Sequence, residues 1–249
     1  MSEKLIWVTG GNSGIGQACV QRFLSKGYKV ISIDRVHDKE LINSNEFQVT
    51  LDLLQLEEIE DWAKKASLQY GIPDVLVNCA GTSRMDYLVD AKLEDWQFTF
   101  ELNVYAVFEL SKAFANLLIK TDKAGRIINI ASQAGKNGYR AMSSYVASKH
   151  ALIGLTKTAA IELAPHNILV NAVCPGIVET AMKHRERIEG GKLRGMTAEE
   201  VFEEDCSQVP LGRTAQADEV AGLVEFLTTE ESSYMTGQAI NITGGMTMH

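Results

Sequence analysis

Short runs of β-branched and aliphatic residues alternate with longer helix-period segments along all 249 residues of the chain. Several of the short runs are apolar at every position, as strands buried on both faces of a parallel sheet are. Seven runs are predicted strands: Leu5–Thr9, Lys29–Ile33, Phe47–Leu51, Val75–Asn78, Arg126–Ala131, Ile168–Val173 and Ala239–Ile242. Five segments are predicted helices: Gly14–Lys26, Leu56–Gln69, Leu93–Ile119, Ser144–Ala164 and Ala217–Leu227. This alternation predicts an α/β fold, a seven-stranded parallel sheet with helices on both faces.

One stretch departs from this rhythm. Residues 177–210 are polar and charged and contain Gly190, Gly191 and Gly195. No repeat or linker divides the rest, so residues 1–249 are predicted to form a single domain with a helical flap at about 177–210. Because glycines allow backbone freedom, we expect 183–200 to be the least ordered internal region. Five cations in the flap are candidates to meet a phosphate or carboxylate, or else form a solvated helical face: Lys183, Arg185, Arg187, Lys192 and Arg194.

The composition excludes several functions. The formal net charge of −8 argues against a nucleic-acid-binding protein. No apolar run approaches the ~20 residues of a membrane span, and the start MSEKLIWVTGG lacks the layout of a signal peptide. The four cysteines form no CxxC pair and the histidines show no metal spacing. We therefore expect a cytoplasmic protein without membrane contact, disulfides or a metal site.

A glycine-rich turn follows the first predicted strand and leads directly into a helix. Residues 9–16 read TGGNSGIG. A helix N-terminus presents free N–H groups and a positive dipole end, which suits a pyrophosphate. Glycines at Gly10, Gly14 and Gly16 allow a tight turn and close approach of the backbone. No Gly-Lys-Ser/Thr follows, so the turn is not a P-loop. It favours a dinucleotide site on a doubly wound, Rossmann-type fold.

Asp34 closes the second predicted strand, 18 residues after Gly16. A carboxylate at this place accepts hydrogen bonds from the adenosine ribose hydroxyls and repels a 2′-phosphate. It therefore favours NAD over NADP. The neighbouring Arg35 is a complication, because a guanidinium pairs well with phosphate.

Tyr145 and Lys149 are four residues apart at the start of a predicted helix and so share one of its faces. Ser132 ends the predicted strand before that helix. Ligands of parallel α/β sheets bind at the carboxyl ends of strands, so Ser132 is placed where the reactive end of a cofactor would lie.

Together these motifs resemble the short-chain dehydrogenase/reductase family from near Lys4 to the end of the chain. The similarity rests on stretches in the family's order: TGGNSGIG (9–16), Asp34, Asp52-Leu53, NCAG (78–81), Asn103, Ser132, YVASK (145–149), PGIVET (175–180) and TGQAINITGG (236–245). Cys79 replaces a second asparagine common in the NCAG motif, and a small buried thiol should be tolerated there.

The resemblance implies a catalytic set of Asn103, Ser132, Tyr145 and Lys149. Tyr145 would exchange a proton with the substrate oxygen, and Ser132 would donate a hydrogen bond to that oxygen. The Lys149 ammonium would lower the pKa of the phenol and hold the nicotinamide ribose. Asn103 would support a water that leads protons away from the lysine.

The resemblance also implies a cofactor-binding set. Asp52 and Leu53 would flank the adenine, Asn78 and Gly81 would shape the floor beside the adenosine ribose, and Thr180 would hold the nicotinamide carboxamide. The full set is Gly10, Asn12, Ser13, Gly14, Ile15, Gly16, Asp34, Asp52, Leu53, Asn78, Ala80, Gly81, Tyr145, Lys149, Pro175, Gly176, Ile177, Val178 and Thr180.

The implied reaction is reversible hydride transfer between NAD and a secondary alcohol or its ketone. Two resemblances within the family compete for the substrate. NIASQAGKNG and the flap ending in PLGR are similar to polyol dehydrogenases. AGTSRMDYLVDAKLEDWQFTFELNV is similar to 2,3-dihydro-2,3-dihydroxybenzoate dehydrogenases, which oxidise a cyclic diol. We favour a polyol, and expect its specificity to be set at 183–200, 84–87 and 133–142.

A nucleotide-sensing or scaffold protein on the same fold is the non-enzyme alternative, and the presence of both Tyr145 and Lys149 disfavours it. Apolar positions in 93–119 and 144–164 exceed what one sheet face needs, which indicates an interface. The family resemblance implies a homotetramer of D₂ symmetry with these helices paired across a two-fold axis.

Overall fold

The computed structural model describes residues 4–249 and contains a seven-stranded parallel sheet in the order β3-β2-β1-β4-β5-β6-β7. The strands are β1 (Leu5–Thr9), β2 (Lys29–Asp34), β3 (Glu46–Thr50), β4 (Val75–Asn78), β5 (Gly125–Ile130), β6 (Ile168–Pro175) and β7 (Ala239–Ile242). The order reverses between β1 and β4, which opens a crevice at the carboxyl ends of these two strands. The predicted doubly wound fold and all seven strands are confirmed, with bounds that differ by at most two residues.

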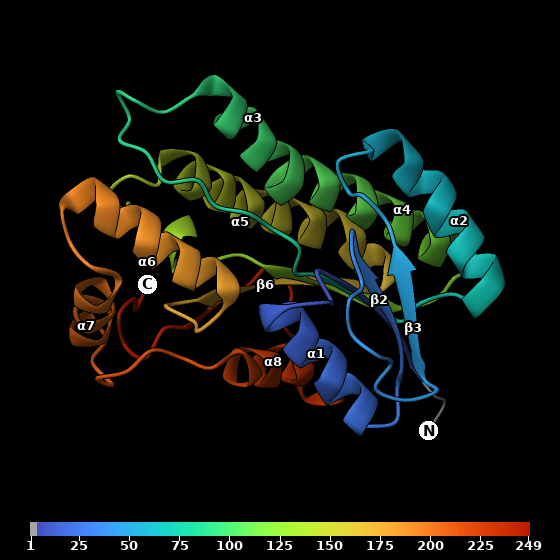
Figure 1. Cartoon of the computed structure of the whole chain (residues 1–249). Helices are drawn as coiled ribbons and strands as arrows, with labels where there is room; N and C mark the ends of the chain where they lie inside the picture. The colour runs from blue at the N-terminus through green and yellow to red at the C-terminus, as the bar shows by residue number, and fades with distance from the viewer. Residues whose placement is uncertain (1–3) are drawn as a thin grey trace.

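Helices cover both faces of the sheet (Figure 1). On one face α2 (Ile59–Tyr70), α4 (Ala106–Lys120) and α5 (Ser143–Leu163) pack over a core that includes Trp7, Phe114 and Leu118. On the other face α1 (Gly14–Ser25) and α8 (Ala217–Phe226) pack over a second core. Fully buried β-branched strand residues face both cores, which explains why the strands are apolar throughout.

The predicted helix Leu93–Ile119 is interrupted. It consists of α3 (Leu93–Phe100), a π-helical turn over Glu101–Tyr105, and α4. Single π-turns within α-helices are frequent at functional sites. This π-turn carries Asn103.

The expectation that no apolar run approaches a membrane span needs a correction. The segment Leu93–Lys120 is long and apolar enough to cross a bilayer, by length and composition alone. Its residues Leu110, Phe114 and Leu118 are fully buried against the sheet. The packing of these side chains accounts for its hydropathy without a membrane, because core helices of globular proteins reach the same values.

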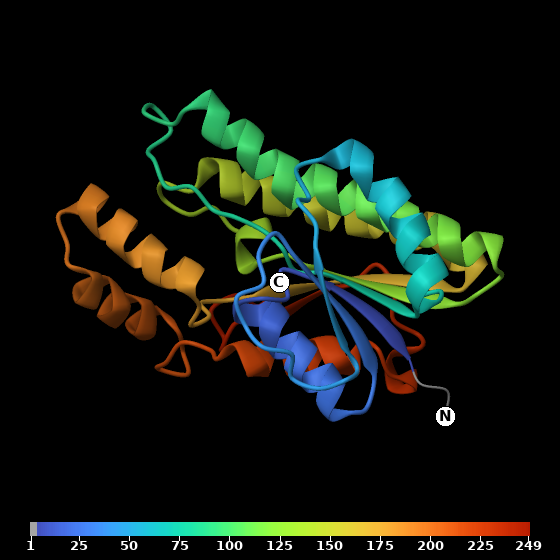
Figure 2. The same ribbon diagram turned by 45° about the vertical axis from the view of Figure 1, so that its right-hand side comes forward.

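The predicted flap is a helical pair, α6 (Ala181–Arg194) and α7 (Ala198–Gln208), which lies beyond the end of the sheet in both views (Figures 1 and 2). Two of its glycines do not provide the expected backbone freedom. Gly190 and Gly191 are buried within α6, where a Cβ would lie 2.9 Å from Met85 Cε and 2.6 Å from the Met196 oxygen. They allow close packing, and Gly195, with a φ of 69°, ends the helix.

Candidate active site

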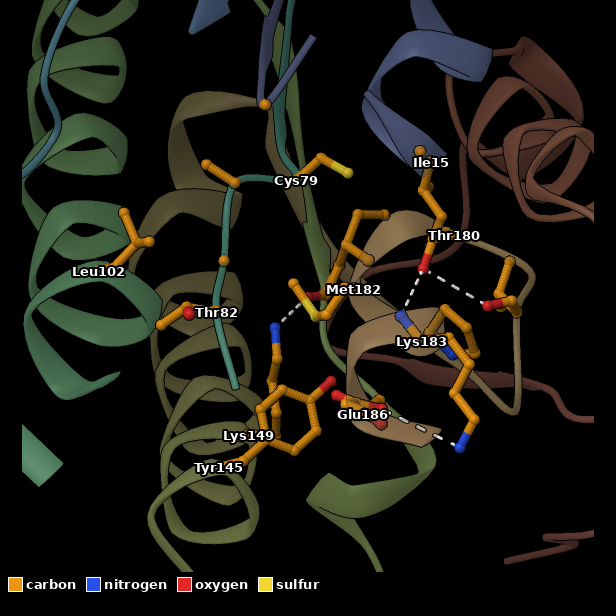
Figure 3. Close-up of a pocket in the computed structure, with 18 of the residues that line it drawn as sticks. Ile15, Cys79, Thr82, Leu102, Tyr145, Lys149, Thr180, Met182, Lys183 and Glu186 are labelled. Atoms are coloured by element: carbon orange, nitrogen blue, oxygen red, sulfur yellow. Dashed lines mark hydrogen bonds and ion pairs between the residues drawn. The ribbon is translucent and has the colours of Figure 1, made fainter. Parts of the chain in front are cut away.

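A cavity of about 540 Å³ opens at the carboxyl ends of the strands and runs from Asp34 past Lys149 to the flap. Most of the predicted site residues line it: Gly10, Ser13, Gly14, Ile15, Asp34, Asp52, Leu53, Ala80, Gly81, Ser132, Tyr145, Lys149, Pro175, Gly176, Ile177, Val178 and Thr180. The remaining four, Asn12, Gly16, Asn78 and Asn103, lie behind this wall or beside it. Figure 3 shows the catalytic end.

The glycine-rich turn has no room for side chains at its key positions. Gly10 has a φ of 68°, and a Cβ there would lie 3.0 Å from the Ala80 backbone. A Cβ on Gly16 would lie 2.1 Å from the carbonyl oxygen of Gly10. Ser13, Gly14 and Ile15 face the cavity at the N-terminus of α1. The turn therefore presents backbone N–H groups, as a pyrophosphate requires, and these residues fit a dinucleotide.

Asp34 is held in place by backbone donors. Its Oδ2 accepts from the Asn12 amide at 3.1 Å, and its Oδ1 accepts from the Arg35 amide at 2.8 Å. The Asn12 side chain donates to Asp38 Oδ1, away from the main cavity, so Asn12 contributes through its backbone. The carboxylate lies at the edge of the cavity near Asp52 and Leu53, as a ribose contact requires.

The floor of the cavity depends on two buried residues. Asn78 donates to Ser111 Oγ and Asn129 Oδ1, and so faces the core and not a ligand. Thr9 is a positioning residue that the sequence interpretation missed, because it looked like part of a strand. Its Oγ1 accepts from the amides of Cys79 and Ala80 at 2.9 and 3.0 Å, which fixes the segment beside the glycine turn.

Tyr145, Ser132 and Lys149 come together at the far end of the cavity, as predicted. Ser132 hydrogen-bonds with the Tyr145 phenol, and its Oγ also accepts from the Ala134 amide. Lys149 is buried, with its Nζ 5.6 Å from the centroid of the Tyr145 ring. That Nζ donates to the Ile130 carbonyl oxygen at 2.8 Å (Figure 3).

The expectation that Lys149 lowers the pKa of Tyr145 is wrong for this structure. Burial raises the pKa of Tyr145 well above its usual value, the Glu186 carboxylate raises it further, and only the Ser132 hydrogen bond lowers it appreciably. Burial also lowers the pKa of Lys149 to about 8. Both shifts favour the neutral forms, because desolvation penalises charge. The Lys149 ammonium donates to the Ile130 carbonyl oxygen and is not among the groups that lower the pKa of Tyr145.

Asn103 is buried in the π-turn. Its Oδ1 accepts from the Thr82 amide at 2.8 Å, and its Nδ2 donates to the Thr82 carbonyl oxygen and to Ser148 Oγ. These bonds tie α4 to the loop after β4 and to the helix that carries Tyr145. A Cβ on Gly81 would lie 3.2 Å from Asn103 Oδ1 and 3.7 Å from Lys149 Nζ, so a side chain at Gly81 would crowd both the amide and the lysine.

The segment after β6 forms the wall beside the glycine turn. Val178 and Ala215 form an isolated parallel bridge, and the Gly176 amide donates to the Ile242 carbonyl oxygen. Thr180 Oγ1 accepts from the Lys183 amide at 3.2 Å and so caps α6 (Figure 3). The same hydroxyl, predicted to hold a carboxamide, already has a second partner, because it donates to the Val178 carbonyl oxygen at 3.5 Å.

Most of the flap cations are paired within the protein. Buried Arg187 binds Glu179 and Asp205, and Arg194 binds Glu204. Lys183 binds Asp205, and Arg185 donates to Ser83. Of the five cations, Lys183 and Arg185 line the cavity. The solvated-face interpretation is wrong for Arg187, which holds the two flap helices together.

Several cavity residues escaped the sequence interpretation. Arg84 and Tyr139, which lie in the segments 84–87 and 133–142 expected to set specificity, line the cavity, whereas Met85 packs against Gly190. Glu186, Gln208 and Met246 were not singled out, yet all three line the cavity. Met246 accepts from Gln133 Nε2, which brings the end of the chain to the site. No local pattern marks these residues, because their neighbours are distant in the sequence.

Comparisons with known proteins agree with this geometry. Residues 10–247 match the family model described as "Enoyl-(Acyl carrier protein) reductase". The chain is 36% identical to the 3-oxoacyl-[acyl-carrier-protein] reductase FabG of Thermotoga maritima over 99% of this chain and 98% of that protein. The chain belongs to the short-chain dehydrogenase/reductase family. It is an oxidoreductase that acts on CH–OH or keto groups with a nicotinamide cofactor, NAD or NADP.

Solved structures similar to this chain differ in substrate and cofactor. Sorbitol-6-phosphate 2-dehydrogenase from Erwinia amylovora aligns with a TM-score of 0.92 at 28% identity, over 98% of this chain and all of that one. An actinorhodin polyketide ketoreductase variant with NADPH aligns with a TM-score of 0.91 at 34% identity, over 98% and 97%. 4-Hydroxyisoleucine dehydrogenase with NADH aligns with a TM-score of 0.82 at 30% identity, over 98% and 99%.

Proposed function

We propose that this protein interconverts a secondary alcohol and its ketone with NAD(H), and that the alcohol is a polyol or another vicinal diol. The observation that carries the proposal is one continuous cavity with Asp34 at its cofactor end and Ser132, Tyr145 and Lys149 at its reactive end. The predicted cofactor-binding residues in its wall fit a dinucleotide.

The nicotinamide, when bound, accepts or supplies the hydride. In the oxidation the substrate carbon loses that hydride and the hydroxyl loses its proton, which Tyr145 takes up; ketone reduction reverses both transfers. Ser132 donates a hydrogen bond to the substrate oxygen, and Lys149, which lines the cavity, would hold the nicotinamide ribose. Asn103 would support a water that leads protons away from Lys149. The hydrogen bonds of its π-turn hold it in place for this role.

NAD is the proposed cofactor because the Asp34 carboxylate stands at the adenosine end and would repel a 2′-phosphate. Solved relatives carry NADH in one case and NADPH in another. The exposed Arg35 beside Asp34 is the feature that favours NADP.

A 3-oxoacyl thioester is the second candidate substrate, since FabG proteins are among the relatives. The substrate end of this cavity combines Lys183, Arg185 and Gln208 with apolar residues such as Met182 and Met246, and we take the polar group to favour a polyhydroxylated compound over an acyl chain. Oxidation of a cyclic diol, as in 2,3-dihydro-2,3-dihydroxybenzoate dehydrogenases, is the third.

The test measures NADH and NADPH formation or consumption over a panel of polyols, cyclic diols, simple ketones and a 3-oxoacyl thioester. We expect the highest kcat/KM with a diol and NAD. Tyr145→Phe should lower turnover at least ~10²-fold, since it removes the proton donor and acceptor, while NADH affinity stays within about twofold. Near-normal turnover in this variant would disprove the assignment of Tyr145.

We further propose that residues 1–249 form one catalytic domain of a cytoplasmic homotetramer with no nucleic-acid or membrane partner. The exposed apolar side chains of Tyr105, Phe108 and Ile119 near α4 and of Ile161 on α5 support an interface there. Light scattering at micromolar concentration should give about four times the mass of the 27.4 kDa chain. A monomeric mass would refute the tetramer.

A further inference from the structure

The Glu186 carboxylate projects from α6 into the substrate end of the cavity and points toward the Tyr145 hydroxyl (Figure 3). Its side chain is only 12% exposed. Its Oε1 accepts from Ser83 Oγ at 2.6 Å. Its Oε2 has the Lys183 ammonium at 4.0 Å, too far for a hydrogen bond. Within residues 4–249, Oε2 is therefore an acceptor without a hydrogen-bond donor.

The charged groups around Glu186 already hold other partners, although Arg185 Nε makes no hydrogen bond within the described part of the chain. Lys183 binds Asp205 at 3.1 Å, and Arg185 donates to the Ser83 carbonyl oxygen at 2.9 Å. Asp205 in turn binds buried Arg187. Burial raises the pKa of Glu186, which indicates that its charge is incompletely compensated. A largely buried acceptor in this state favours a ligand that brings a donor, because the little solvent that reaches it offers few replacement hydrogen bonds.

The position of Glu186 determines where the donor must be. In the proposed function Tyr145 and Ser132 contact the oxygen on the reacting carbon, so a group that reaches Glu186 belongs to the adjacent part of the substrate. A hydroxyl on the next carbon satisfies this requirement. A second ammonium is disfavoured by Lys183 and Arg185, which already flank the carboxylate. A 3-oxoacyl thioester has no donor on the carbons adjacent to its ketone.

We propose that Glu186 determines specificity for a vicinal diol, by accepting at Oε2 a hydrogen bond from the hydroxyl on the carbon next to the reacting carbon. This inference rests on the proposed alcohol–ketone function. It assigns the flap a direct role in choosing the substrate, and it makes the diol preference depend on one side chain.

The experiment compares kcat/KM for butane-2,3-diol with kcat/KM for butan-2-ol, which lacks the second hydroxyl, both with NAD. Wild type should prefer the diol by roughly 10- to 100-fold, the scale of one hydrogen bond to a charged group. Glu186→Gln keeps the shape and should lower kcat/KM for the diol about tenfold. Glu186→Leu should bring the ratio of the two substrates near one. Because Glu186 also raises the pKa of Tyr145, turnover of butan-2-ol serves as the internal reference, and the ratio of kcat/KM for the two alcohols is the readout.

Glu203→Gln on the exposed face of α7 is the matched control and should behave as wild type. Thermal unfolding of each variant checks that the fold is intact. The inference is overturned if wild type shows no preference for the diol, or if Glu186→Gln lowers kcat/KM equally for both alcohols, which is what a purely structural carboxylate would do. The proposed function fails separately, if no secondary alcohol or ketone of the wider panel is turned over.

Discussion

The two ends of the cavity are built by different means. At the cofactor end the backbone forms the wall, and positions such as Gly10 and Gly16 leave no space for a Cβ. At the substrate end side chains of the flap form the wall, and ion pairs such as Arg187–Asp205 hold them. A wall of backbone tolerates almost no substitution, whereas a wall of side chains can change its chemistry and keep its fold. This difference predicts that relatives share one fold but act on several substrates.

A pair of glycine substitutions tests this contrast most strongly. Gly16→Ala would place a Cβ 2.1 Å from the Gly10 carbonyl oxygen, which can move only if the turn opens. We expect NADH affinity to fall by up to ~100-fold, the scale of severe overpacking. Gly190→Ala meets the flexible end of Met85 and should leave NADH affinity within about twofold. Titration calorimetry measures the NADH affinity of both variants. Equal losses of affinity would show that the two walls do not differ in their tolerance of substitution.

Cofactor choice at Asp34 should respond by a smaller factor. Asp34→Ala removes the ribose acceptor and the repulsion of a 2′-phosphate, and leaves Arg35 free to pair with that phosphate. We expect the ratio of kcat/KM with NAD to kcat/KM with NADP to fall by roughly 10-fold or more. Steady-state kinetics with both cofactors measures the ratio. A wild type that already prefers NADP would show that Arg35 outweighs Asp34.

The smallest effect concerns stability at the reactive end. Burial lowers the pKa of Lys149 to about 8 in the folded protein from its ordinary value of 10.5, so between pH 8 and 10.5 the unfolded chain holds more protons. The contribution of this residue to the free energy of unfolding therefore rises as the pH increases from 8 to 10.5. The gain is lost again as the pH falls back through that window. Lys149→Met removes the cost of burying a charge but also loses the hydrogen bond to Ile130. The net result should be a variant more stable than wild type at pH 7, by on the order of 1 kcal/mol.

Thermal unfolding at pH 7 and pH 9.5 measures this difference, which corresponds to about 2–4 °C for a domain of this size. The advantage of Lys149→Met should shrink at the higher pH. An advantage that grows with pH would mean that Lys149 is stabilised in its charged form, which contradicts the burial effect.

Local patterns predicted the sheet and the glycine-rich turn well, because both depend on short-range features. The strand runs, the turn at 9–16 and the four-residue spacing of Tyr145 and Lys149 lie within single segments. Patterns failed where contacts are long-range. Glu186 is held by a hydrogen bond from Ser83, which is 103 residues away. The π-turn at Asn103 is held by hydrogen bonds to the loop after β4 and to α5.

The sequence by itself determined the order of strands and helices, the glycine turn, and the presence of a tyrosine, a lysine and a serine at the carboxyl ends of the sheet. These follow from residue periodicity and from steric rules that act over a few residues. The tertiary structure alone decided which flap cations pair within the protein, that burial raises the pKa of Tyr145, and that Glu186 points toward the Tyr145 hydroxyl. Desolvation and charge pairing depend on every neighbour in space, and those neighbours come from all parts of the chain.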